Sequence, residues 1–212
     1  THGFNWIPTR QPVVKRHWPA LPRGSDVFST LGKWEHAAER RVQFAGQTYE
    51  SSKARQWWKL LDLPTRTSWK LRMAMADVPT EAQRQFESHG WGFDDPAQAS
   101  RDPAAFQRYV ANCAGELTVA KEIYTALPSG WFSDRSACFL MSGRPVITQA
   151  SGFDQWLPTG EGLFSFQTVD EAAGALEAIR SDYGLHSRRA RQIAEENFES
   201  AKVLKDLLDR VA

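Results

Sequence analysis

The sequence lacks the features that would place it in several large classes of protein. No apolar run approaches the length needed to span a bilayer, and no signal peptide is recognisable. Lys and Arg number 26 against 25 Asp and Glu, a formal net charge of +1, which disfavours a strongly basic nucleic-acid-binding or membrane-surface protein. We therefore expect a cytoplasmic protein without a transmembrane segment.

Only two cysteines are present, Cys113 and Cys138, and neither has a Cys-x-x-Cys neighbour. We expect both to be reduced thiols in apolar surroundings. The five histidines are scattered, and there is no DxD motif or His/Cys cluster, so no metal site is predicted. The chain has no initiator Met and begins Thr1-His2-Gly3, so we expect it to derive from a longer precursor.

What the sequence does contain is the patterning of a globular α/β protein. Its 212 residues are 42% hydrophobic and include nine tryptophans, which favour core packing first and stacking on flat ligands second. Strands are predicted at residues 12–18, 27–31, 41–49 (a hairpin around Ala45-Gly46), 69–76, 116–120, 145–150 and 163–166. Helices are predicted from Ser51/Ser52 to about Leu61, from Thr80 to Gly90, at 103–113, from Ser133 to Ser142, behind a capping box of Thr168 and Glu171, and over the last residues, including Val203 to Val211.

Strand and helix alternate, most clearly after residue 115, which predicts an α/β domain with a mainly parallel sheet of about five or six strands. Residues 1–11 are irregular and are interpreted as a linker or crossover arm before a domain at 12–212. Ligands on such sheets bind beyond the carboxyl ends of the strands, where loops lead into helix N-termini.

The segment 128–166 is the most informative for chemistry. Gly130 and Ser133 open a helix, whose first turn would offer unpaired N–H groups suited to phosphate. Arg135 lies in that first turn, where the helix dipole disfavours a cation unless an anion or carboxylate is near. A bound diphosphate would remove this conflict, and so would an ion pair with Asp134; on the first interpretation, Arg135→Ala should weaken nucleotide binding and leave stability nearly unchanged.

Three glycines follow in the same segment, at positions 152, 160 and 162. Glycine lets the backbone approach a ligand closely or turn sharply. Taken singly, each is an ordinary turn residue.

Taken together, the pattern GWFSDRSA, GRPV, SGF and LPTGEGL within residues 130–163 resembles the C-terminal, donor-binding domain of group 1 glycosyltransferases of the GT-B architecture. The stretch IPTRQPVV at 7–14 resembles the entry into that domain, so the resemblance covers almost the whole chain. It implies a Rossmann-like three-layer sandwich that binds a nucleoside-diphosphate sugar, with the acceptor-side N-terminal domain absent from this chain. Glycosyl transfer would then require that domain as a partner.

By this resemblance, Gly32, Lys33 and, less directly, Lys53 would contact the donor diphosphate together with Gly130, Ser133 and Arg135. Fixed cations suit a diphosphate leaving group, and the family usually works without metal or cofactor. Many relatives carry two glutamates in this region, but the matching positions here are Gly130 and Cys138. Ribose or sugar hydroxyls would fall to Asp134, Glu161 and Gly152, and no catalytic residue is assigned.

Two other functions remain open. The chain could be a non-catalytic nucleotide- or sugar-binding module, since the glutamates and the companion domain are missing. Nucleic-acid binding is a weaker alternative, because residues 53–72 interleave basic side chains with tryptophans, a pattern that can also describe an ordinary amphipathic helix and strand.

Overall fold

The computed structural model describes residue 3 and residues 6–34, 41–50 and 52–211. The strands are Val27–Lys33 (β1), Val42–Phe44 (β2), Gln47–Tyr49 (β3), Lys70–Ala76 (β4), Gly92–Phe93 (β5), Gly115–Thr118 (β6), Val146–Gln149 (β7) and Leu163–Phe166 (β8). The α-helices are Ala54–Trp58 (α1), Thr80–Ser88 (α2), Pro96–Ser100 (α3), Pro103–Asn112 (α4), Glu122–Ala126 (α5), Asp134–Met141 (α6), Val169–Ser181 (α7), Tyr183–Asn197 (α8) and Ser200–Val211 (α9). Short 3-10 turns cover Lys15–His17, Leu63–Arg66 and Phe153–Gln155.

Six strands form one parallel sheet in the order β5-β4-β1-β6-β7-β8. Counted among themselves along the chain, they follow the order 3-2-1-4-5-6, in which the direction of sheet growth reverses between the first and fourth strands. This topological switch point falls between β1 and β6. Sheets of this order bind ligands outside the carboxyl ends of the strands at that point.

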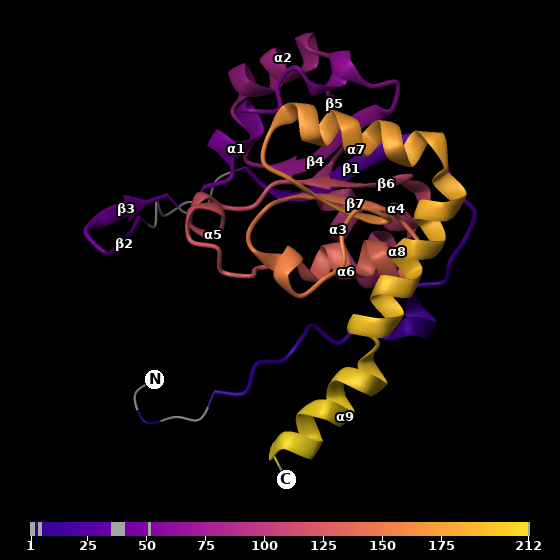
Figure 1. Cartoon of the computed structure of the whole chain (residues 1–212). Coiled ribbons are helices and arrows are strands. Elements are labelled where there is room, and N and C mark those ends of the chain that lie inside the picture. The colour runs from indigo at the N-terminus through magenta and orange to yellow at the C-terminus, as the bar shows by residue number, and fades with distance from the viewer. Residues whose placement is uncertain (1–2, 4–5, 35–40, 51, 212) are drawn as a thin grey trace.

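Helices cover both faces of the sheet (Figure 1). Helices α1, α2 and α7 contribute to one buried cluster, and α4, α6 and α8 contribute to the other. Helix α3 contacts β1 and β4 on the second face. The expected three-layer α/β, Rossmann-like sandwich with a parallel sheet is therefore confirmed.

The tryptophans that are buried belong to the first cluster. Trp34, Trp57, Trp69 and Trp91 are each at most 6% exposed, and the rings of Trp57 and Trp91 meet edge to face at 5.8 Å. Four of the nine tryptophans thus serve the core, the first of the two roles that the composition suggested.

Two segments differ from their predicted structure. Residues 12–18 form no strand beyond a single bridge between Val13 and Glu199, because the apolar run is only two residues long and follows Pro12, which has no N–H to donate. The helix expected to run to Leu61 ends at Trp58. Between Trp58 and Pro64 the backbone hydrogen bonds join residues three apart, as in a 3-10 helix, instead of four apart. Ser51, its proposed start, lies outside the described residues.

The sequence reasoning missed α3, α5, α8 and β5. Helix α8 has fifteen residues but buries only His186, Ala190, Ile193 and Ala194, so its apolar stripe is narrow and made partly of small side chains. The other predicted strands and helices form within a few residues of their predicted ends, and the capping box of Thr168 and Glu171 at the start of α7 is confirmed. None of the described helices is long and apolar enough to cross a membrane.

Helix α8 packs closely against the turn that precedes β8. A Cβ placed on Gly162, whose φ is +74°, would lie 2.3 Å from the backbone nitrogen of Ala190. Gly160 also has a positive φ, but a Cβ there would meet nothing within 4 Å. Glycine is therefore required at position 162 so that α8 can pack against this turn, and this requirement does not depend on a ligand.

These two glycines form a matched pair for a stability test. Gly160→Ala should cost about 1–2 kcal/mol of unfolding free energy, the strain of an L-residue with positive φ. Gly162→Ala should cost more than Gly160→Ala, because it adds a backbone collision to that strain. Urea denaturation of both variants measures the difference, and equal losses would contradict this account of Gly162.

Candidate functional site

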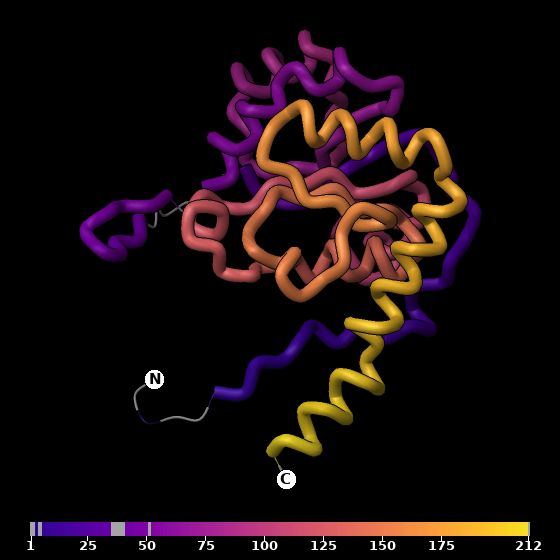
Figure 2. The backbone as a smooth tube through the Cα atoms, in the orientation of Figure 1, coloured from indigo at the N-terminus to yellow at the C-terminus, as the bar shows by residue number. Residues whose placement is uncertain are grey.

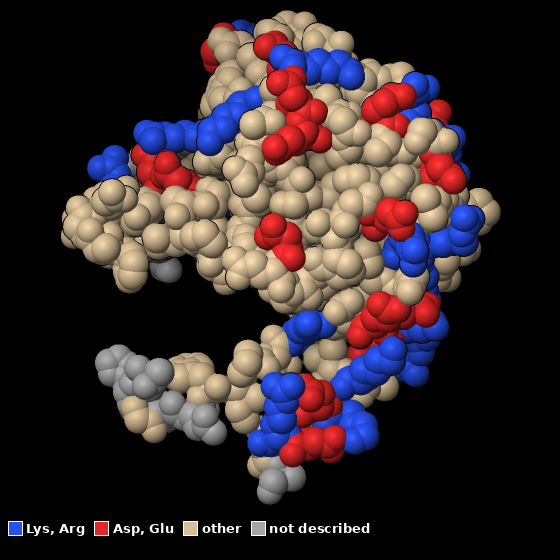
Figure 3. Space-filling view, viewed as in Figure 1, with Lys and Arg blue, Asp and Glu red and all other residues tan. Residues whose placement is uncertain are grey.

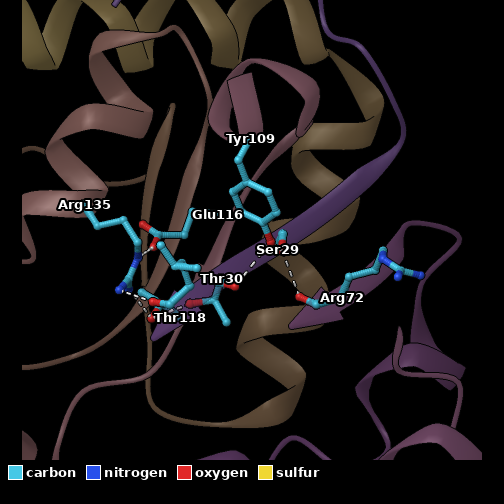
Figure 4. Close-up of polar contacts among 8 residues, drawn as sticks. Ser29, Thr30, Arg72, Tyr109, Glu116, Thr118 and Arg135 are labelled. Atoms are coloured by element: carbon cyan, nitrogen blue, oxygen red, sulfur yellow. Dashed lines mark hydrogen bonds and ion pairs between the residues drawn. The ribbon is translucent and has the colours of Figure 1, made fainter. Parts of the chain in front are cut away.

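The guanidinium of Arg135 lies across the carboxyl ends of β1 and β6, at the topological switch point (Figure 4). Its Nη1 donates to the carbonyl of Leu31 on β1, and its Nη2 donates to Oγ1 of Thr118 on β6 at 2.9 Å. The hydroxyl of Thr30 in turn donates to Oγ1 of Thr118 at 3.2 Å. The guanidinium thus ties together the two strands that flank the site.

The charge of Arg135 is balanced by Glu116 on β6. Arg135 Nε donates to Oε1 of this carboxylate, which is fully buried, while the arginine side chain is 15% exposed. This carboxylate resolves the conflict between a cation and the start of α6, in place of the expected Asp134. The second carboxylate oxygen of Glu116 is buried without a hydrogen-bond partner among the described residues.

A second cation, Lys53, lies next to this pair. It is half-buried at the residue before α1, and its Nζ lies 5.5 Å from the centroid of the Trp131 ring. Burial, with a further contribution from the nearby Arg135, lowers the pKa of Lys53 to about 7. Glu116 opposes this shift and Lys121 adds to it.

The end of β1 supplies Gly32 and Lys33. A Cβ on Gly32 would lie 4.0 Å from Nη1 of Arg135, so the backbone passes beside the guanidinium. Lys33 is exposed, with its Nζ 3.7 Å from the carboxylate of Asp77. The structure therefore brings Gly32, Lys33, Lys53 and Arg135 to one edge of the sheet.

Helix α6 begins at this edge. Ser133 occupies the N-cap position, but its hydroxyl makes no capping hydrogen bond. The first intrahelical bond runs from the N–H of Ala137 to the carbonyl of Ser133, so the three N–H groups before Ala137 have no helical partner. Whether these groups bind an anion, as the sequence predicts, stays a prediction.

Gly130 lies just before this helix with a different role from the expected one. Its N–H donates to the carbonyl of Ser151 at 2.8 Å, and its carbonyl accepts from Nε1 of Trp156 at 3.1 Å. A Cβ on Gly152 would be 3.4 Å from this same N–H. Gly130 and Gly152 are therefore neighbours that fix the loop before α6 against the loop after β7, and the N–H of Gly130 is already used.

Two predicted residues lie apart from this group. Asp134 is exposed and borders a hollow of about 570 Å³ shared with Gln107 and Cys138. Glu161 comes directly before the segment that enters β8, at the amino edge of the sheet, and pairs with Arg189 at 2.8 Å. Glu161 is therefore not brought together with the residues at the carboxyl edge.

The basic stretch 53–72 does not form a stacking groove in the part of the chain described. Trp57 and Trp69 are buried. Arg55 pairs with Glu50, Arg66 with Asp170 and Arg72 with Asp94. This arrangement matches an ordinary helix and strand and leaves the nucleic-acid alternative without support.

Glu116 is the main site residue that sequence reasoning missed. The signal was present, since an acidic side chain in the apolar run Ala114 to Ala120 must find a cation if the strand is buried. Trp131 was missed because an aromatic residue in a loop has many possible roles.

Buried amides connect the site to its surroundings. The side chain of Gln149, at the end of β7, donates to Oε1 of Gln56 on α1 at 2.7 Å and accepts from the N–H of Ala120 at 3.3 Å. This link fixes α1, and with it Lys53, against the ends of β6 and β7. Among the described residues no group of three or more His, Cys, Asp or Glu side chains is arranged to hold a metal ion.

Comparison with known proteins reveals similarity at the level of the fold. No protein-family model matches the sequence, and no curated protein matches it. The structure of Anabaena Alr3699/HepE in complex with UDP and glucose superposes with a TM-score of 0.61 at 14% identity, over 96% of this chain and 55% of that one.

Two further solved structures give similar values. AviGT4, a glycosyltransferase involved in avilamycin A biosynthesis, matches with a TM-score of 0.61 at 11% identity, over 94% of this chain and 55% of its own. Sucrose-phosphate synthase from Thermosynechococcus elongatus matches with a TM-score of 0.63 at 12% identity, over 95% and 51%. The chain has the fold of part of these glycosyltransferases and spans about half the length of each.

The contacts of Arg135 revise the expected effect of removing it. Arg135→Ala should lower the unfolding free energy by about 3–5 kcal/mol, because it leaves the carboxylate of Glu116 buried without its cation. Replacing both partners, as in Arg135→Met with Glu116→Leu, should destabilise less than Arg135→Ala alone. Chemical denaturation compares the two, and an Arg135→Ala protein as stable as the wild type would show that the ion pair does not support the fold.

Proposed function

We propose that this chain is the donor-binding half of a metal-independent glycosyltransferase. A nucleoside-diphosphate sugar would bind at the carboxyl ends of β1 and β6, with its diphosphate against the first turn of α6. The proposal needs no cofactor, and the two free thiols are consistent with a cytoplasmic protein.

One observation carries this proposal. The switch point of a 3-2-1-4-5-6 sheet, where such folds bind their ligands, holds two neighbouring cations, Arg135 and Lys53, at the start of a helix. Unpaired N–H groups, the positive end of a helix dipole and fixed cations all favour a diphosphate. Structures of the similar HepE were determined with UDP and with UDP-glucose.

Roles can be assigned on this basis. Lys53, Lys33 and the first turn of α6 after Ser133 would contact the diphosphate, and Gly32 would let it approach the backbone. Arg135 would act mainly by holding this edge in place, since it already bonds two strands and Glu116. Gly130 and Gly152 would shape the sugar side of the site. Glu161 has no part, because it lies at the other edge of the sheet.

Transfer would require a companion domain for the acceptor. The arm before Val13 and helix α9 extend from the same end of the body (Figure 2). Arg10 on the arm bonds to Asn197 at the end of α8, and Arg210 on α9 donates to the carbonyl of Pro8. Leu204 and Leu208, one turn apart on α9, are 46% and 63% exposed. Charged side chains of both signs lie along α9 (Figure 3), among them the pairs Lys205 with Asp209 and Arg210 with Asp206. We propose that residues 1–11 and α9 contact the companion domain, and residues 12–212 form the donor domain.

The alternative is a binding module that holds a nucleotide or sugar without turnover. It is favoured by the absence of acidic residues at Gly130 and Cys138, where relatives carry glutamates. The two functions share the binding site and differ in whether transfer occurs when a companion domain is present.

The isolated chain should bind UDP-glucose or another nucleoside-diphosphate sugar and transfer no sugar measurably, because the acceptor side is missing. Titration calorimetry with a panel of nucleoside diphosphates and their sugars tests binding, and release of free nucleoside diphosphate tests turnover. Absence of saturable heat at millimolar concentration with every ligand would reject the proposed site, and turnover by this chain alone would reject the need for a companion.

A methyl group at Gly32 should weaken that binding without unfolding the protein. A Cβ there meets only Met75 at 3.6 Å and Arg135 at 4.0 Å, so Gly32→Ala fits the fold and fills space at the phosphate. Overpacking a contact typically costs about 1–3 kcal/mol, so affinity should fall by about tenfold. Gly174→Ala on α7, which meets nothing within 4 Å, is the control and should bind as the wild type does. Equal affinity of both variants would place the diphosphate elsewhere.

A further inference from the structure

The surroundings of Lys53 in the unliganded protein stabilise a positively charged ammonium poorly. The lysine is half-buried, and no carboxylate among the described residues lies within salt-bridge distance of its Nζ. Its Nζ lies 5.5 Å from the centroid of the Trp131 ring, and the ring of Tyr124 stacks on that of Trp131 with the two centroids 5.2 Å apart.

The charges that face Lys53 come from three places. Arg135 on α6 and Lys121 after β6 disfavour a further cation, and Glu116 on β6 favours one. Glu116 is already engaged with Arg135 through a direct hydrogen bond. Two other ion pairs lie at this edge among the described residues, Arg55 with Glu50 and Lys33 with Asp77. The carboxylate of Glu122 accepts from the N–H of Glu50.

We infer that Lys53 takes up a proton from solvent when the diphosphate of a nucleotide donor binds, so that donor binding is coupled to protonation. The inference rests on the proposed function and deepens it. The diphosphate supplies a negative charge that no carboxylate of the described residues places within salt-bridge distance of Lys53, and the neutral amine becomes an ammonium that donates to a phosphate oxygen. The only covalent change is proton transfer: an N–H bond forms at Nζ of Lys53, and the bond between the proton and the buffer acid breaks.

The coupling has a definite sign. With a pKa of about 7, Lys53 is mostly a neutral amine at pH 8 in the free protein. A bound diphosphate stabilises the ammonium and raises the pKa, so binding at pH 8 should take up close to one proton. Affinity should then fall by up to about tenfold per pH unit as the pH rises above 7, and should level off below it.

Calorimetric titration with UDP-glucose tests this directly, because the charge of its diphosphate is constant between pH 6 and 8.5. At pH 8, titrations in buffers of different ionisation enthalpy should give uptake close to one proton, and at pH 6 the uptake should be near zero. Lys53→Arg should still bind but lose both the uptake and the pH dependence, because a guanidinium stays charged. Lys70→Arg, at an exposed lysine where β4 begins on the opposite edge of the sheet, is the matched control and should keep the uptake.

Lys53→Met covers the case in which arginine does not fit the position. Its affinity should be reduced and independent of pH. Without ligand, the melting temperature of the wild type relative to Lys53→Met should rise between pH 7 and 9, since the unfolded chain binds the extra proton over that range. If the difference in melting temperature between the wild type and Lys53→Met stays constant from pH 7 to 9, the inference is overturned.

The failures are distinguishable. If UDP-glucose binds the wild type with pH-independent affinity and no proton uptake, the coupling is wrong and the proposed function stands. If uptake persists in Lys53→Arg, another group takes the proton and the inference is overturned. If neither UDP-glucose nor any other nucleoside-diphosphate sugar binds at any pH, the proposed function fails, and the inference fails with it.

Discussion

The candidate site depends on the ion pair between Arg135 and Glu116. In a parallel sheet of this order a crevice forms outside the carboxyl ends of the paired strands β1 and β6, because the helices that follow these strands turn to opposite faces. Arg135 spans the gap with bonds to both strands, and a buried carboxylate keeps it in position. The guanidinium of Arg135 is therefore held in one position at the base of the site. The more exposed Lys33 and the half-buried Lys53 lie beside it and can contact a ligand directly. Fixed dipoles and charges stabilise a developing anion best when they need not reorganise.

The sequence could predict most of the fold because local signals and global topology agree. The capping box at Thr168, the Pro and Gly stops and the apolar strands all point to the observed elements. Helix α8 was not predicted, because its buried face consists mainly of Ala190, Ile193 and Ala194. The small side chains give only a weak helical periodicity of hydrophobic residues among many polar ones. The order of strands in the sheet is a long-range property, and no local pattern around Gly115 reveals that β6 lies beside β1.

The site was only partly predictable for a related reason. Motif resemblance located the start of α6 and the end of β1, which the structure brings together. It placed Glu161 in the same site because a glycine-flanked turn in sequence does not reveal which edge of the sheet it occupies. It explained Arg135 by a ligand, whereas the nearest anion is the side chain of Glu116, nineteen positions away along the chain. Hydrophobic periodicity describes neighbouring positions along the chain, so it cannot predict an ion pair between residues that are far apart in the sequence.

The sequence of the β2–β3 hairpin can change during evolution without disturbing the candidate site. The chain leaves the sheet after Lys33, forms this hairpin, and returns to the same edge at Lys53, where Glu50 anchors it to the carboxylate of Glu122. The three residues of β2 are exposed, so the described residues of the body place little constraint on their identity. Insertions, deletions and substitutions at the hairpin tip can therefore accumulate without moving either lysine. Among proteins with this arrangement, we expect the hairpin to vary more in sequence and length than β1 and α1, which hold the positions of Lys33 and Lys53.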